Sequence, residues 1–340
     1  LITPWNNPIV LSSWKVAAGL AAGNALVVKP ASLTPLSIMR IAGIAAAAGL
    51  PDGLLNIVTG PGGVLGDRLI GHPQVAKVSF TGSTEVGKGV MRLAADRLAR
   101  VSLELGGKSP SIVFADAPLD LALEGSIPAM FANAGQMCTA RSRILVDERI
   151  ADEFIERLGT KIAALRLGSP FDADADVGPV ISRGQMTTIQ GFVSRALAGG
   201  AEAVAGSADP VDEEGLREGS FVRPTLLAGL DDSMEAVREE IFGPVLVVDS
   251  FADEGEALAR GNDSPYGLAA TIWTRDLARA HRSAAALEAG TVTVNTTKVS
   301  HVYAPFGGYK QSGLGRELGL EGLDEFLETK NVIIRTAADE

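Results

Sequence analysis

The sequence has little of the residues on which several common site types depend. Its 340 residues include one cysteine and three histidines, which excludes an internal disulfide and argues against a structural zinc site. Aromatic residues are only 5%, and acidic residues outnumber basic ones by 41 to 30. The resulting net charge of −11 argues against a nucleic-acid-binding protein. No apolar run approaches the roughly 18 residues of a membrane span.

What is present is typical of a folded globular protein. Apolar residues make up 46% of the chain and charged residues 21%, enough for a large core in one or two domains. The chain begins with Leu1, and its opening has neither the basic region nor the cleavage site of a signal peptide. We therefore expect a cytoplasmic protein whose parent chain has been shortened at the front.

The first third of the chain alternates between two hydrophobic periods. Strands are expected at 25–29, 54–58, 75–80 and 101–105, with helices at 35–49, 64–70 and 85–98. This alternation predicts an α/β fold with a parallel sheet covered by helices on both faces. Ligands of such sheets bind at the carboxyl ends of the strands.

The remainder alternates less regularly. Strands are expected at 111–114, 143–146, 245–248, 269–273 and 291–295, with helices at 119–133, 150–165 and 182–197. The polar segment 172–178 is expected to be a loop, and 209–219 either the tip of a hairpin or a surface loop. Residues 331–335 form a β-branched run that predicts a final strand with no evident partner nearby.

Two glycine clusters could hold phosphate. Residues 60–66 nearly match G-x-G-x-x-G, but Leu65 replaces the third glycine, which favours an ordinary strand-to-helix turn. Residues 82–88 match G-x-x-x-x-G-K, follow an expected strand and open an expected helix. The positive end of that helix favours an anion, so Ser83 is predicted to lie beside phosphate.

The second cluster leaves a P-loop ATPase open as an alternative. Gly89 stands where the magnesium-binding hydroxyl of a P-loop belongs, which counts against it. Residues 112–116, ending in Asp116, could pass as a weak Walker-B strand.

Three residues are candidates for chemistry. Cys138 lies between an expected helix and an expected strand, although a lone cysteine is often only a small buried hydrophobe. Glu104 ends an apolar strand, where a carboxylate is costly unless it reacts or is paired, with Lys108 as one possible partner. Asn6 follows Trp5 between two prolines and could simply form a turn. The histidines lie in no Cys–His signature, which argues against a papain-like hydrolase.

Taken together, these residues resemble the aldehyde dehydrogenase superfamily. The matching segments, in the family's order, are PWN at 4–6, KPA at 29–31, FTGS at 80–83, ELGGK at 104–108, GQMC at 135–138, EEIFGP at 239–244 and PFGG at 305–308. The 34 residues from Glu104 to Cys138 are also the family's usual spacing.

The resemblance implies a reaction in which an aldehyde is oxidised to a carboxylic acid. The Cys138 thiolate would attack the aldehyde, and the Asn6 amide and the Cys138 N–H would stabilise the oxyanion. A hydride would pass to NAD(P)⁺, leaving a thioester that water hydrolyses with Glu104 as general base. The presence of Glu104 favours this hydrolytic branch over the branch that transfers the acyl group to coenzyme A.

The resemblance also implies a nicotinamide dinucleotide site. Lys29 would contact the adenosine ribose, Ser83 the pyrophosphate and Glu240 the nicotinamide ribose, with Phe242 near the ring. The full set of expected cofactor contacts is Thr3, Pro4, Trp5, Lys29, Ser32, Gly82, Ser83, Leu105, Gly106, Glu240 and Phe242. Many members carry an acid at the position of Ser32. A neutral hydroxyl there predicts that NADP is tolerated as well as NAD.

Six residues are candidates for the walls of a substrate tunnel, although core packing accounts equally well for the same residue types. The candidates are Asn7, Leu11, Trp14, Met137, Thr139 and Phe306. Asn7 replaces an aromatic residue common in the family, which predicts a more polar or more open wall. A small-molecule aldehyde is the expected partner, but its identity is not encoded in these residues, and no metal is expected.

The architecture implied by the resemblance has three parts. A Rossmann-like cofactor domain at 1–107, incomplete at its N-terminal side, precedes an α/β catalytic domain at 108–311. Residues 312–340 would form a return segment and an oligomerisation strand, so a homodimer or homotetramer is expected. A retired homologue with a structural or binding role stays open as an alternative. Only the missing front favours it, because Cys138, Asn6 and Glu104 are all present.

Overall fold

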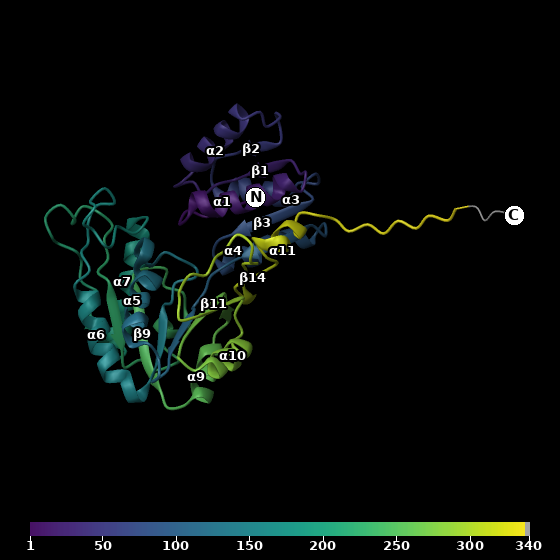
Figure 1. Ribbon diagram of the computed structural model, residues 1–340. Coiled ribbons are helices and arrows are strands. Elements are labelled where there is room, and N and C mark those ends of the chain that lie inside the picture. The colour runs from purple at the N-terminus through teal and green to yellow at the C-terminus, as the bar shows by residue number, and fades with distance from the viewer. Residues whose placement is uncertain (337–340) are drawn as a thin grey trace.

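Two sheets organise the molecule, and the computed structural model describes residues 1–336 of the chain (Figure 1). The first sheet lies in the upper lobe of Figure 1 and the second in the lower lobe. The last described residues, up to 336, leave the upper lobe as an extended segment. The observed α/β fold with parallel sheets agrees with the fold class predicted from the alternating periods.

The first sheet is assembled from short pieces. Its strands are β1 (Leu26–Val28), β2 (Leu55–Ile57), β3 (Lys77–Thr81), β4 (Arg100–Glu104) and β14 (Gly313–Leu314). β1 pairs with β2 and β3 with β4 in parallel, while β14 runs antiparallel to β4. The strands β1 and β3 are joined through Ile2, whose N–H donates to Ser79 O (2.9 Å) and whose carbonyl accepts from the Thr81 N–H (3.1 Å).

Helices cover this sheet. They are α1 (Pro8–Ala21), α2 (Leu36–Ala47), α3 (Gly62–Gly71), α4 (Thr84–Ala95) and the short α11 (Gly319–Asp324). We did not expect α1 from the sequence, although Pro8 at its first turn is a favourable helix start. Two small apolar clusters fill the lobe, one around Val28 and Ile38 and the other around Phe80 and Leu103.

The second sheet has seven strands in the order β12-β11-β5-β6-β9-β8-β7. Their bounds are β5 (Pro110–Val113), β6 (Arg143–Asp147), β7 (Glu202–Ala205), β8 (Thr225–Ala228), β9 (Val245–Phe251), β11 (Ala269–Trp273) and β12 (Thr291–Val294). All neighbours are parallel except β7 and β8. A separate two-stranded ribbon pairs β10 (Tyr266–Gly267) with β13 (Tyr309–Lys310).

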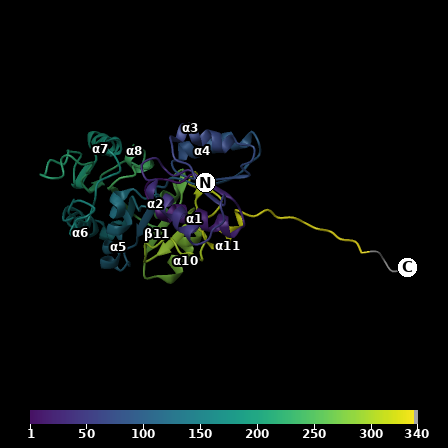
Figure 2. The ribbon, with the colours of Figure 1, turned by 90° about the horizontal axis from the view of Figure 1, so that it is seen from above.

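Helices lie on both faces of the second sheet (Figures 1 and 2). They are α5 (Leu119–Phe131), α6 (Ala151–Ala163), α7 (Arg183–Ala198), α8 (Glu235–Arg238), α9 (Glu254–Asn262) and α10 (Leu277–Ala286), with 3-10 turns at Ala132–Gly135 and Glu148–Ile150. Successive residues of a strand face opposite sides. In β5, Val113 joins the core that contains Phe154 of α6, whereas Ile112 packs with Ala257 of α9.

The structure corrects one expected element and adds others. Residues 331–335 are not in a strand, and Ile333 is 87% exposed. In the single chain this run has no neighbouring strand to pair with, and the assembly that it was expected to form stays a prediction. The strands β7 and β8 pair antiparallel on either side of the polar segment 209–219, which agrees with the hairpin tip expected there as one alternative, although no bounds were predicted for these strands. The domain boundaries at 107 and 311 stay predictions, although β14 lies in the first sheet.

The described residues contain neither a membrane-spanning helix nor a cluster of metal-binding side chains. None of the helices within 1–336 has the length and apolar character that a membrane crossing requires. Over the same range, His, Cys, Asp and Glu side chains do not gather in groups of three or more that could hold a metal ion.

Candidate active site

The candidate site surrounds the segment that leads from the first sheet into the second. Glu104 is the last residue of β4, and β5 begins at Pro110. Four other segments meet this connection: the turn before α1, the loop before β6, the segment after α8 and the glycine-rich stretch at 305–308. They carry Asn6, Cys138, Glu240 and Phe306. The structure thus brings together residues that lie up to 300 positions apart.

Cys138 lies in a tight turn that follows a strained stretch of backbone. The Ala140 N–H donates to Met137 O (3.0 Å), which closes a turn with Cys138 and Thr139 at its centre. Just before it, Asn133, Ala134 and Gly135 adopt the left-handed conformation, with φ of 52°, 54° and 73°. Such conformations are costly for residues other than glycine and are typical of functional loops.

The Cys138 thiol is partly accessible but has a strongly raised pKa. Burial raises the pKa of Cys138 to about 12, and the nearby Glu240 and Glu104 carboxylates add to the increase. The backbone N–H groups of Cys138 and Thr139 act in the opposite direction. A thiolate at this position therefore needs stabilisation from positive charge or from N–H donors.

Asn6 is held against the cysteine loop by side-chain and backbone contacts. Its Nδ2 donates to Gln136 O (2.9 Å), and its own carbonyl accepts from Asn133 Nδ2 (2.8 Å). The Gln136 side chain is fixed in turn, because its Nε2 donates to Asn133 O (3.0 Å) and its Oε1 accepts from the Ile181 N–H (2.9 Å). The Asn6 amide is thus bound to Gln136, the residue two positions before Cys138.

Glu104 is buried without an ion-pair partner of its own. Burial, followed by the charge of Glu317, raises the pKa of Glu104 well above its ordinary value, and Lys15 opposes the shift. Its Oε2 is buried and has no hydrogen-bond partner in the described structure. The proposed pairing with Lys108 is wrong, because Lys108 Nζ donates to Ala236 O (2.7 Å).

A second carboxylate reaches the same connection from the segment after α8. Glu240 Oε1 accepts from the Gly107 N–H (3.0 Å), and a Cβ on Gly106 would lie 2.4 Å from Glu240 Oε2. On the other side, a Cβ on Gly107 would lie 2.4 Å from Cys138 O. The two glycines are required because Glu240 and the cysteine loop leave no room for side chains.

Glu240 titrates near neutrality in this setting. Burial raises the pKa of Glu240 to about 7, while the Gly107 N–H and Lys108 act to lower it. Next to it, Phe242 has a φ of 55° and makes an edge-on contact with Trp5, with ring centroids 5.3 Å apart. The expected cofactor residues Trp5, Glu240 and Phe242 therefore lie close to one another.

One further cofactor candidate, Lys29, lines a cavity of about 450 Å³ beside α3 and α4. Lys29 lines this cavity with only 4% of its surface exposed, and its Nζ donates to Pro30 O (3.0 Å). The lining residues include Ile2, Lys29, Gly62, Gly66, Asp67, Phe80, Val86, Val90 and Arg92. Burial lowers the pKa of Lys29.

Three other cofactor candidates border this region. Ser83 is the N-cap of α4 and accepts from the Val86 N–H (3.4 Å). Ser32 is exposed and donates to Gly60 O (3.0 Å). Leu105 packs closely on Gly87 of α4, where a Cβ would lie 2.5 Å from a Leu105 methyl.

Thr3, Pro4 and Gly82 complete the cofactor candidates. They follow the strand positions around Ile2 and Thr81 at the carboxyl edge of the first sheet. The interpretation of residues 60–66 as an ordinary turn was incomplete. The turn is ordinary, but Gly62 and Gly66 of α3 also line the cavity.

The tunnel candidates form two groups. Asn7 Nδ2 lies 2.9 Å from Met137 Sδ, and Trp14 contacts Phe306 edge-on with centroids 5.3 Å apart. Leu11 of α1 and Thr139 are both buried, with 7% exposed. A role for these six residues in substrate binding stays a prediction.

The sequence reasoning missed several residues that support the site. Lys15 of α1 is fully buried, donates to Ser79 Oγ (3.0 Å) and forms a buried ion pair with Glu317 near Glu104. Only the charge of Lys15 in an otherwise apolar helix could have indicated it. The supporting roles of Asn133 and Gln136 have no clear sequence signal.

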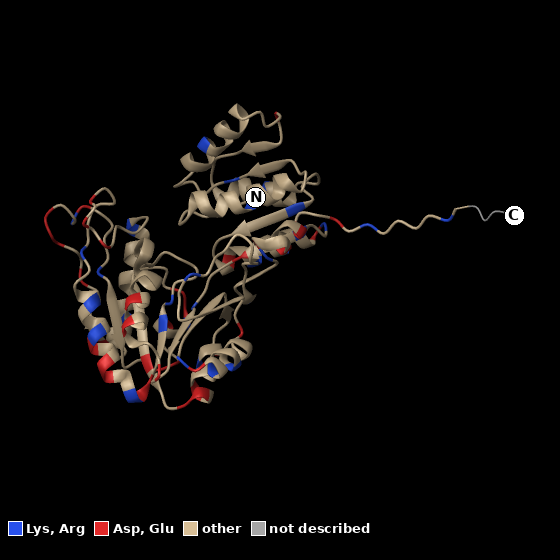
Figure 3. Ribbon diagram, viewed as in Figure 1, with Lys and Arg blue, Asp and Glu red and all other residues tan. Residues whose placement is uncertain are grey.

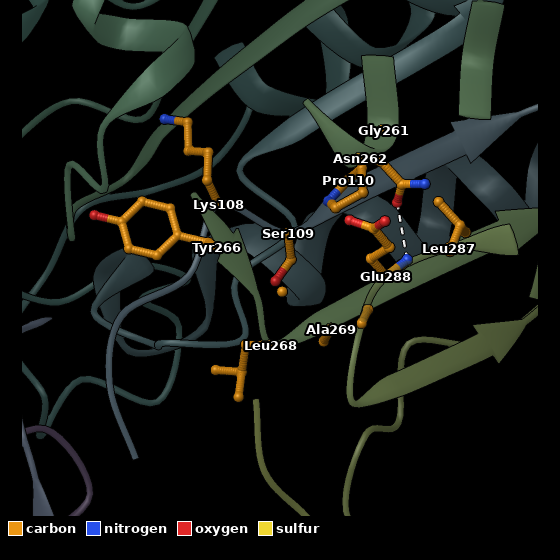
Figure 4. A pocket seen from close by; sticks show the side chains of 13 residues that line it. Lys108, Ser109, Pro110, Gly261, Asn262, Tyr266, Leu268, Ala269, Leu287 and Glu288 are labelled. Carbon is orange, nitrogen blue, oxygen red and sulfur yellow. Dashed lines mark hydrogen bonds between the residues drawn. The ribbon is translucent and has the colours of Figure 1, made fainter. Parts of the chain in front are cut away.

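A small cavity lies behind the connection and carries no chemistry. Its volume is about 10 Å³, room for about one water. Figure 4 shows Lys108 extending away from it, while the Glu288 N–H donates to Asn262 Oδ1 (2.8 Å) on the opposite side.

The P-loop alternative is contradicted by the topology. Gly82 follows β3 of the first sheet, whereas Asp116 follows β5 of the second. Asp116 accepts from the Thr274 hydroxyl (2.8 Å) and from Arg279 Nη1 (2.8 Å), far from the start of α4 in the topology. A Walker-B strand and the P-loop strand belong to one sheet so that both reach the bound nucleotide, and here the two belong to different sheets.

The fold and the site define an α/β protein in which a cysteine loop and two carboxylates meet at the connection between two sheets, with a separate cavity in the first lobe. The aldehyde dehydrogenase family matches residues 1–332. The chain belongs to the aldehyde dehydrogenase family. The resemblance inferred from seven short segments is thereby confirmed.

Named relatives agree with this assignment. The chain is 43% identical over 335 residues to a betaine aldehyde dehydrogenase of Bacillus subtilis (strain 168), covering 98% of this chain and 68% of that protein. It is 45% identical over 332 residues to betaine aldehyde dehydrogenase 1 of Oryza sativa subsp. japonica, covering 98% and 65%. The chain thus spans about two thirds of the length of these relatives.

Solved structures share the fold closely. A betaine aldehyde dehydrogenase from Staphylococcus aureus in complex with NAD⁺ superimposes with a TM-score of 0.95 at 44% identity, covering 97% of this chain and 65% of that one. An aldehyde dehydrogenase from Bacillus cereus gives 0.93 at 41%, covering 96% and 66%.

Proposed function

We propose that this chain oxidises an aldehyde to a carboxylic acid with NAD⁺ or NADP⁺. The observation that carries the proposal is the convergence of Cys138, Asn6, Glu104 and Glu240 on the connection at Gly106 and Gly107. Family membership and relatives named as aldehyde dehydrogenases supply the reaction class.

Nucleophilic attack falls to Cys138. Its Sγ bonds to the aldehyde carbon, and the carbonyl oxygen becomes an oxyanion. The Asn6 Nδ2, which now donates to Gln136 O, and the Cys138 N–H are the donors suited to that oxyanion. The hydrogen bond from Asn133 to the Asn6 carbonyl keeps the amide in place while its partner changes.

Hydrolysis of the resulting thioester falls to Glu104. Its buried carboxyl, with the raised pKa noted above, can accept a proton from water near neutral pH and release it later. Within the nearby Lys15–Glu317 ion pair, Lys15 limits the rise of the Glu104 pKa whereas Glu317 adds to it.

The cradle fits a nicotinamide dinucleotide. Gly106 and Gly107 let Glu240 and the cysteine loop approach each other, Glu240 offers a carboxylate for ribose hydroxyls, and the cavity with Lys29 has room for the adenosine half. When bound, this cofactor accepts the hydride. Trp5 and Phe242 lie beside Glu240 at the end where the ring would be held.

We further propose that NADP⁺ is accepted because Ser32 places no negative charge near Lys29. The cavity lining carries two cations, Lys29 and Arg92, against one acid, Asp67. Ser32→Glu tests this by adding an anion where a 2′-phosphate would lie. The ratio of kcat/KM for NADP⁺ to that for NAD⁺ should fall about tenfold or more. Strict NAD⁺ specificity of the unchanged chain would refute the proposal.

The reaction is tested by reduced-nicotinamide formation with short, long and aromatic aldehydes. Betaine aldehyde enters the panel because it appears in the names of the relatives. Its neutral carbon isostere, 3,3-dimethylbutanal, is the matched substrate. A preference of about 2- to 30-fold for the cation would point to an aromatic face such as Trp14 or Phe306.

The control for this assay is Cys138→Ala, which should abolish turnover while cofactor binding persists. Absence of turnover with every aldehyde by a folded, cofactor-binding chain would instead support the retired-homologue alternative. We also propose a homo-oligomer, with light scattering after size exclusion as its measurement. A monomer at micromolar concentration would contradict it.

A further inference from the structure

Arg141 is a buried cation with no acidic partner, three residues after the nucleophile. It is 2% exposed, and its Nε donates to Thr271 Oγ1 (2.8 Å). Its Nη1 donates to the carbonyl of Thr139, the residue that follows Cys138. Among the described residues no carboxylate bonds to this guanidinium, and its Nη2 has no hydrogen-bond partner. A buried charge without a counter-ion is costly and calls for an explanation.

The guanidinium is turned back toward the cysteine turn. Arg141 lies just after that turn, its backbone N–H donates to Ala129 O (3.1 Å) at the end of α5, and its side chain bonds to the turn's own carbonyl. Its positive charge therefore lies close to Cys138, and the two interact electrostatically. The carboxyls of Glu240 and Glu104 raise the pKa of Cys138, and both disfavour a thiolate.

We propose that Arg141 is a positioning residue that supplies the positive charge needed to hold Cys138 as a thiolate. This inference rests on the proposed function of Cys138 as nucleophile. The absence of a counter-ion is required for this role, because a carboxylate paired with the Arg141 guanidinium would cancel its positive field at the Cys138 sulfur. Thr271 and the Thr139 carbonyl are neutral acceptors that fix the guanidinium without neutralising it.

Arg143 is a matched control on the same segment. It is also buried, at 5% exposed, and its guanidinium donates to the carbonyls of Arg260 (2.8 Å) and Gly261 (2.9 Å). The charges around Arg143 are those of Asp232, Arg260, Arg238 and Asp263 rather than that of Cys138. Removing its charge perturbs packing to a similar degree but leaves the cysteine turn alone.

The test is the pH dependence of Cys138 alkylation by iodoacetamide in the full chain, followed by mass spectrometry of its peptide. Cys138 is the only cysteine of the 340 residues, so the signal is unambiguous. Arg141→Met should shift the alkylation profile to higher pH and slow the reaction at pH 7.5 at least threefold. Arg141→Lys should recover most of the rate, and Arg143→Met should leave the profile in place. An unshifted profile in folded Arg141→Met would overturn the proposal.

A second variant keeps the arginine and cancels its charge. Thr293 is on the edge strand β12, and its Oγ1 lies 2.8 Å from Thr271 Oγ1. That Thr271 oxygen is the one that accepts from Arg141 Nε. Thr293→Asp should give Arg141 a counter-ion and shift the profile in the same direction as Arg141→Met, whereas the neutral Thr293→Asn should not. Equal profiles for Asp and Asn would contradict the proposal even if Arg141→Met does not fold.

Alkylation needs neither aldehyde nor cofactor, so this result is independent of turnover. A chain that fails to oxidise any aldehyde but shows the expected shifts would refute the proposed function and keep Arg141 as the charge beside Cys138.

Discussion

The two sheets differ in how they are built. The second has seven hydrogen-bonded strands and an extensive apolar core on one face, which includes the fully buried Trp273. The first has strands of two to five residues, is joined through Ile2 and encloses only two small clusters. Figure 3 shows many charged residues on the lower lobe and few at the top of the upper lobe, around α1, α2 and β2.

This difference assigns the holding of the strained site segments to one lobe and the space for a ligand to the other. The segments that carry Cys138 and Glu240 belong to the lobe with the larger core, which can impose the strained backbone at 133–135 and at Phe242. The smaller lobe contributes the cavity around Lys29, where glycines and short helices leave room for a ligand. The variants below are expected to affect either stability or cofactor binding according to the lobe they change.

The largest effect is expected for Trp273→Ala in β11. Trp273 is 1% exposed, and its Nε1 donates to Ser111 Oγ (3.0 Å). Loss of this side chain should lower the free energy of unfolding by about 3–5 kcal/mol. Urea unfolding followed by circular dichroism measures it. A loss below about 1 kcal/mol would show that the second sheet is not the stable part.

Next is Gly106→Ala, which tests the junction between the lobes. The new methyl group would displace Glu240 Oε2, which lies 2.4 Å from the ideal Cβ position, and with it the bond to the Gly107 N–H. A hydrogen bond to a charged group contributes about 1.5–3 kcal/mol, so the Kd for NAD⁺ should rise about 10- to 100-fold.

Isothermal titration measures that Kd, with Gly43→Ala of α2 as control. A Cβ on Gly43 meets no atom within 4 Å, so cofactor binding should not change. Equal affinities of the two variants would show that Glu240 does not hold the cofactor.

A smaller effect is expected for Val28→Ala in the first sheet. Val28 is fully buried, but it belongs to a small cluster with Val16, Leu26 and Ile38. The loss of two methyl groups should cost about 1–2 kcal/mol, less than Trp273→Ala. Comparison of the urea midpoints measures the difference. A larger loss than for Trp273→Ala would reverse the proposed ranking of the lobes.

The smallest effect concerns pH. Because the pKa of Glu240 is raised from 4.5 to about 7, its carboxyl favours the folded state below pH 4.5 and loses that contribution as pH rises through 7. The stability of Glu240→Gln relative to the unchanged chain should therefore increase from pH 5 to pH 6, by about 1 kcal/mol. Thermal unfolding at both pH values measures it, and a constant difference would contradict the shift.

The sequence predicted most elements of both sheets because their periods are strong and their turns carry glycine or proline. Its limits lie in contacts between distant segments. The link through Ile2 depends on three residues that are too few to show a period. The pair of Lys15 with Glu317 spans 302 positions. Arg141 gives no sign in the sequence that its charge is buried, because that depends on Thr271 and Thr139.

The sequence named the site residues but not the residues that support them. Cys138, Glu104 and Asn6 were chosen from family motifs, and the structure places them around one connection, but their catalytic roles stay proposals. The cavity-lining positions of Gly62 and Gly66 were not predicted, because the comparison with a phosphate-loop motif considers only the loop. In the structure these glycines lie on the surface of α3 that lines the cavity.

The left-handed turn at 133–135 limits how this chain can diverge. A library of all substitutions there would be depleted of β-branched residues at Asn133 and Ala134, because their branched side chains clash with the backbone at positive φ. At Gly135 any side chain would also meet Gly243 O, 2.2 Å from the ideal Cβ position. Mutational tolerance should therefore fall to its minimum three residues before the nucleophile, at a position that touches no substrate.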